Sequence, residues 1–95
     1  MNPKNLKVAL TRRLPSPVEA RLSDLFDTTL HDSDEPLSPE GLVSRAQDVD
    51  VLAPTLGDRL DNAFFDAVGP RLRMVANFGA GTDHIDVAAA NARGI

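Results

Sequence analysis

The sequence predicts an α/β domain in which a parallel sheet carries helices on both faces. Two observations lead to this expectation. Short apolar runs alternate four times with segments that carry apolar residues at helical spacing. The loops between them are short and hold proline, glycine, serine and aspartate, which end one element and begin the next. Such alternation is typical of strand-helix units joined by right-handed crossovers, which make the strands parallel.

The first predicted strand, residues 6–11, ends at an Arg-Arg-Leu-Pro loop. A helix is expected to follow, with Ser16 as its cap, Pro17 in its first turn and Glu19 completing a capping box. Helical spacing predicts one buried face for this helix, made of Val18, Leu22, Leu25 and Phe26. A weak second strand over residues 28–31 suits an edge of the sheet.

The middle of the chain shows the same alternation of helix and strand, with clearer sequence signals at the helix ends. Ser38-Pro39 predicts a second helix start, with Leu42, Val43 and Ala46 facing inward. The third strand, residues 49–53, stops at a proline. Asp61 is the expected cap of the third helix, where Leu60 and Phe65 are spaced for a hydrophobic staple. Gly69-Pro70 ends that helix, because glycine tolerates the conformation past a helix end and proline cannot continue it.

The fourth strand is predicted over residues 72–76, and the last helix from near Asp86 to Gly94. Four such units favour the strand order 2-1-3-4, a flavodoxin-like, doubly wound arrangement. Ligands of these sheets bind beyond the carboxyl ends of the strands. The loops expected there are residues 12–15, 54–57 and 78–83.

The last two residues, Gly94-Ile95, suit a helix end followed by the start of a fifth strand. Without that strand, the fourth would be a bare hydrophobic edge, which native proteins avoid. We therefore expect residues 1–95 to be the front part of a longer protein, with the fifth strand of the sheet missing.

Composition narrows the class of protein. The 95 residues suit one domain, and 42% hydrophobic and 25% charged residues are ordinary for a globular chain. A net charge of −4 argues against nucleic acid and against an acidic membrane surface as partners. The absence of cysteine excludes disulfides and thiolate metal sites, and we predict no metal site. With no secretory or membrane-spanning apolar run, we expect a cytoplasmic protein.

The glycine loop Gly79-Ala80-Gly81 is the candidate binding site. Two glycines one residue apart let the backbone turn tightly and leave no side chains over the loop. The free N–H groups of such a loop, with a helix start behind it, favour a small anion such as a substrate carboxylate. From the residues alone, a plain turn between strand and helix has equal weight.

This loop does not match the dinucleotide-binding fingerprint. His84 stands where the third glycine would be, and the loop follows the fourth strand rather than the first strand of a unit. As a lone histidine before a helix, His84 is interpreted as a packing or capping residue rather than a catalytic one. Asp83 and Asp86 are expected to cap the last helix, with Asp83 alternatively shaping the cleft. Three further residues are expected to be solvated, namely Arg12, Arg13 and His31, although the two arginines lie where a substrate or another domain would contact them.

Residues 75–86, Val-Ala-Asn-Phe-Gly-Ala-Gly-Thr-Asp-His-Ile-Asp, are followed by an alanine-rich helix and Arg-Gly-Ile. Together they resemble the D-isomer-specific 2-hydroxyacid dehydrogenases. Residues 11–15, Thr-Arg-Arg-Leu-Pro, and 31–37, His-Asp-Ser-Asp-Glu-Pro-Leu, are similar to the glyoxylate/hydroxypyruvate reductase branch. The resemblance extends over essentially the whole chain.

The resemblance implies a two-domain oxidoreductase that uses NADH or NADPH to reduce a 2-keto acid to a D-2-hydroxy acid. Residues 1–95 would be the N-terminal part of its flavodoxin-like substrate-binding domain. In that family, backbone N–H groups at the positions of Ala80 and Gly81 hold the substrate carboxylate, next to Gly79. The position of Leu56 lines the cleft, and the full-length enzyme is a homodimer.

The family's nucleotide-binding domain and its catalytic arginine, glutamate and histidine come later in the chain. The resemblance therefore implies that residues 1–95 contain no catalytic or cofactor-binding residue and are inactive alone. Two other proteins of this fold class are rejected. A receiver domain needs paired acids after the first strand, and a flavodoxin needs a Ser/Thr-rich loop there, whereas Arg12-Arg13 follows. The retained alternative is a truncated, non-catalytic domain that binds small carboxylates or a partner chain.

Overall fold

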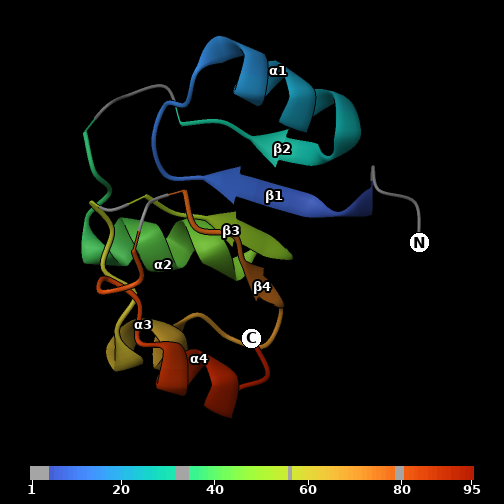
Figure 1. Cartoon of the computed structure of the whole chain (residues 1–95). Coiled ribbons are helices and arrows are strands. Elements are labelled where there is room, and N and C mark those ends of the chain that lie inside the picture. The colour runs from blue at the N-terminus through green and yellow to red at the C-terminus, as the bar shows by residue number, and fades with distance from the viewer. Residues whose placement is uncertain (1–4, 32–34, 56, 79–80) are drawn as a thin grey trace.

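The computed structural model describes residues 5–31, 35–55, 57–78 and 81–95. Within them, strands and helices alternate as predicted (Figure 1). The elements are β1 (Lys7–Leu10), α1 (Ser16–Leu25), β2 (Asp27–Thr29), α2 (Pro39–Gln47), β3 (Val51–Ala53), α3 (Asn62–Ala67), β4 (Met74–Val75) and α4 (Val87–Ala92). The sheet is parallel throughout, in the order β2-β1-β3-β4. The predicted fold class and strand order are confirmed.

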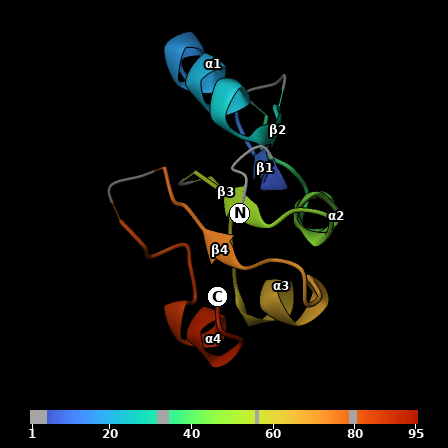
Figure 2. The same cartoon turned by 90° about the vertical axis from the view of Figure 1, so that its right-hand side faces the viewer.

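One face of the sheet holds the main core. Figure 2 shows α2 and α3 on the same side of the sheet and α4 beyond β4. Ala9 of β1 and Leu52 of β3 point into this core, both fully buried. Because strand side chains alternate, their neighbours Val8 and Val51 point to the other face. The core is completed by side chains from the helices and from the loops before them: Leu42, Ala46, Leu60, Phe64, Phe65, Val68, Ala89 and Ala90.

The expected buried face of α1 is wrong, because the helix contains no buried residue. Leu25 is 38% exposed, and Leu22 is only half-buried. The reason is position: α1 packs against the edge strand β2 and does not lie across the centre of the sheet. An apolar groove of about 240 Å³ is left, lined by Leu6, Val8, Leu22, Phe26, Val51, Ala53, Met74, Ala76 and Phe78.

The Ser-Pro dipeptides at the starts of α1 and α2 differ in whether the serine caps the helix. Ser38 caps α2 as predicted, since its Oγ accepts a hydrogen bond from the Gly41 N–H at 3.0 Å. Ser16 does not cap α1, and the predicted capping box is wrong. The first turn of α1 closes on the carbonyl of Pro15, and the Glu19 carboxylate accepts from the Leu14 N–H at 3.1 Å. The helix therefore begins one residue earlier than predicted, with no side-chain cap.

The third helix confirms its predicted boundaries. Asp61 caps α3 by accepting from the Phe64 N–H at 2.9 Å. Leu60 and Phe65, the expected staple, both lie in the core. Gly69 follows the helix at φ +84°, a conformation that residues with a Cβ rarely adopt. At Gly69 the chain leaves the helix and runs back toward β4.

The two Ser-Pro sites give a matched test of the capping assignment. Ser38→Ala should lower the free energy of unfolding by about 1 kcal/mol, because it leaves a helix N–H without its acceptor. Ser16→Ala should change it by less than about 0.5 kcal/mol. Urea denaturation of both variants measures the difference. Equal losses at the two sites would contradict the structure.

Candidate functional site

The loops after β3 and β4 run side by side at the carboxyl edge of the sheet. The Phe78 N–H donates to the Pro54 carbonyl at 2.8 Å, which extends the strand pairing past β4. Further on, the Leu60 N–H donates to the His84 carbonyl at 2.9 Å, and the Leu60 carbonyl accepts from the Asp86 N–H at 2.8 Å. Two of the three loops predicted to form the ligand edge are thus joined by backbone hydrogen bonds.

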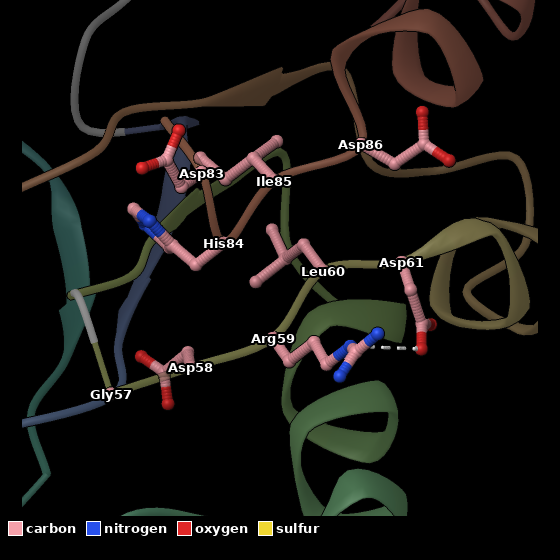
Figure 3. Close-up of a pocket in the computed structure, with 9 residues that line it drawn as sticks. All are labelled: Gly57, Asp58, Arg59, Leu60, Asp61, Asp83, His84, Ile85 and Asp86. Atoms are coloured by element: carbon pink, nitrogen blue, oxygen red, sulfur yellow. Dashed lines mark ion pairs between the residues drawn. The ribbon is translucent and has the colours of Figure 1, made fainter. Parts of the chain in front are cut away.

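A pocket of about 580 Å³ lies between these loops (Figure 3). Its lining residues are Gly57, Asp58, Arg59, Leu60, Asp61, Asp83, His84, Ile85 and Asp86. Figure 3 shows the Arg59 side chain turned toward Asp61, with which it forms an exposed ion pair at 3.7 Å. Among the described residues, no group of three or more possible metal-binding side chains is found. The pocket therefore offers mixed polar surface but no metal centre within that part of the chain.

Asp58 is a buried carboxylate that joins β1 to the loop after β3. It is 3% exposed, and its Oδ2 accepts hydrogen bonds from the Thr11 hydroxyl and from the Thr55 N–H, the latter at 3.0 Å. Its Oδ1 has no hydrogen-bond partner among the described residues. Asp58 was not predicted from the sequence. A signal was available, because Asp three residues after Thr55 suits a turn, and the Asp58 N–H does donate to the Thr55 carbonyl at 3.1 Å.

Arg12 is not the solvated side chain that was expected. It is half-buried, and its Nε is buried without a partner among the described residues. Its guanidinium lies against Gly57, where an added Cβ would come within 3.2 Å of the Arg12 Cζ and closer still to Nη2. Arg13 is exposed, as expected. A side chain at Gly57 would therefore have to move the flexible end of Arg12 aside.

The predicted carboxylate loop is described only in part. Gly79 and Ala80 lie outside the described residues, as does Leu56. Gly81 is exposed, and an added Cβ there would meet no atom within 4 Å. Its carbonyl accepts a hydrogen bond from the side chain of Asn77 at 2.9 Å. Whether the N–H groups of this loop bind a carboxylate remains a prediction.

The start of the last helix is confirmed, and one expectation about Asp83 is corrected. The helix begins at Val87, as predicted, and Asp86 caps it by accepting from the Ala89 N–H at 3.0 Å. Asp83 does not cap the helix and lines the pocket instead, the alternative that the sequence left open.

Both histidines make specific hydrogen bonds. His84 Nε2 lies 2.8 Å from the Asn77 Oδ1, which agrees with a packing role. His31 is half-buried rather than solvated, since its Nε2 lies 3.0 Å from the Glu35 carbonyl and its Nδ1 lies 3.3 Å from Arg45 Nη2. Because Arg45 can only donate, His31 Nδ1 accepts and Nε2 donates.

The chain is thus an open parallel α/β domain with two joined loops at the carboxyl edge of its sheet, the edge at which ligands of such sheets bind. Comparison with known proteins then identifies the family. Residues 8–95 match the family model described as D-isomer specific 2-hydroxyacid dehydrogenase, catalytic domain. The chain belongs to this family, as the motifs around the glycine loop predicted.

Relatives and solved structures agree with this assignment. The glyoxylate reductase of Thermococcus kodakarensis is 39% identical over 89 residues, which are 94% of this chain and 26% of that protein. A crystal structure assigned to the D-isomer specific 2-hydroxyacid dehydrogenases, from Polaromonas sp. JS6 66, superposes with a TM-score of 0.89 at 36% identity, over 95% of this chain and 28% of that one.

A third comparison is with an NADPH-dependent glyoxylate/hydroxypyruvate reductase from Sinorhizobium meliloti, solved in complex with NADP and malonate. It is 30% identical, with a TM-score of 0.66 over 95% of this chain and 26% of that chain. The chain thus spans about a quarter of the length of the relatives it matches.

The contact between Arg12 and Gly57 yields a test by double-mutant cycle. Gly57→Ala should lower the free energy of unfolding by no more than about 1 kcal/mol, because the new methyl group displaces the flexible end of the Arg12 side chain. In an Arg12→Ala background the same change should cost less, giving an interaction energy of about 0.5 kcal/mol or more. Gly81→Ala is the matched control and should change stability by less than about 0.5 kcal/mol. Strict additivity of the two substitutions would contradict the contact.

Proposed function

We propose that residues 1–95 form the N-terminal part of the substrate-binding domain of an NADPH- or NADH-dependent D-2-hydroxyacid dehydrogenase. Its substrates would be glyoxylate or hydroxypyruvate, reduced to the corresponding 2-hydroxy acid. The observation that carries the proposal is that the residues on either side of the glycine loop, Phe78 and His84, are hydrogen-bonded to the loop after β3 at the carboxyl edge of the sheet, in a chain of this family. The names of the relatives support the choice of substrate.

Within this proposal, residues 1–95 contribute substrate anchoring. The N–H groups of Ala80 and Gly81 would hold the carboxylate, Gly79 would let the loop turn, and Leu56 would line the cleft. Backbone donors suit this task, because they are held in place by the fold and keep their direction when charge shifts during reaction. A small 2-keto acid is thereby bound by its carboxylate, with its ketone free to react.

The described part of the loop does not suit a dinucleotide. The ring of His84 occupies the place of the third fingerprint glycine and is hydrogen-bonded to Asn77. The helix start that would face a pyrophosphate is capped by Asp86. We therefore assign cofactor binding, hydride transfer and protonation of the ketone to parts of the full-length enzyme outside residues 1–95.

The proposal also covers the cellular location, the oligomeric state and the partners of the full-length enzyme. Among the described helices, none has the length and apolar character needed to cross a bilayer. The net charge of −4 disfavours binding to nucleic acid. We propose a cytoplasmic enzyme that dimerises in its full-length form and binds neither nucleic acid nor membrane.

Carboxylate binding is testable on the chain itself. Titration of the ¹⁵N-labelled protein with glyoxylate or malonate should shift the amide signals of Ala80 and Gly81 first, with affinity no tighter than about millimolar for one backbone-held carboxylate. Malonamide, which lacks the charge, is the matched control ligand and should shift neither. Shifts confined to Arg12 and Arg13 would contradict the loop assignment.

Because cofactor binding and hydride transfer are assigned to other parts of the full-length enzyme, we expect that residues 1–95 alone do not oxidise NADPH in the presence of glyoxylate. The absorbance of NADPH should fall no faster than in buffer. Turnover that survives repeated purification would show that catalytic groups lie within these residues. Carboxylate binding without turnover, together with a reading frame that stops at Ile95, would instead favour the alternative of a non-catalytic binding domain.

A further inference from the structure

We draw no further inference here: the strongest candidate, the apolar groove of about 240 Å³ that Phe26, Met74 and Phe78 help to line on the face of the sheet away from α2 and α3, carries none because nothing in the described part of the structure shows what covers it.

Discussion

The arrangement of the loops at the carboxyl edge of the sheet depends on the two backbone hydrogen bonds of Leu60. Its N–H and carbonyl bind the His84 carbonyl and the Asp86 N–H, while its side chain is fully buried in the core. Together with the bond from the Phe78 N–H to the Pro54 carbonyl, Leu60 therefore joins the loop after β3 to the loop after β4, and its buried side chain fixes them to the packed interior. Parallel strands bring their carboxyl ends to one edge, but only such cross-loop bonds give the segments beyond the strands a defined relative position.

The side chain of Asp58 makes a second connection between segments at this edge of the sheet. A buried carboxylate is costly unless hydrogen bonds compensate it, and Thr11 and Thr55 provide them. Through Asp58, the end of β1 is coupled to the loop after β3, and through Leu60 that loop is coupled to the loop after β4. The end of β1 and the loops after β3 and β4 behave in this account as one unit.

Features set by residues close together in the sequence could be predicted, whereas contacts between loops could not. Alternating apolar runs predicted the sheet, and Ser38, Asp61 and Gly69 marked helix ends because each acts on backbone within three residues. The prediction that Ser16 caps α1 was wrong. The same Ser-Pro pattern gives no cap there, because the Glu19 carboxylate accepts a hydrogen bond from the Leu14 N–H. The burial of α1, the Arg12 contact and the Asn77–His84 pair all depend on which segments the fold brings together, which spacing does not reveal. The motif around Gly79 and Gly81 identified the family, but not how Gly81 is held.

Hydrogen exchange at Leu60 tests this account most directly. If its two backbone bonds hold the edge, the amide protons of Leu60 and Asp86 should exchange nearly as slowly as that of Ala76, whose N–H is bonded to the Leu52 carbonyl at 2.8 Å in the sheet. Asp58→Ala should speed the exchange of Leu60 more than that of Ala76. Rapid exchange of Leu60 and Asp86 beside a protected Ala76 would show that the loops move independently, and would contradict the central claim.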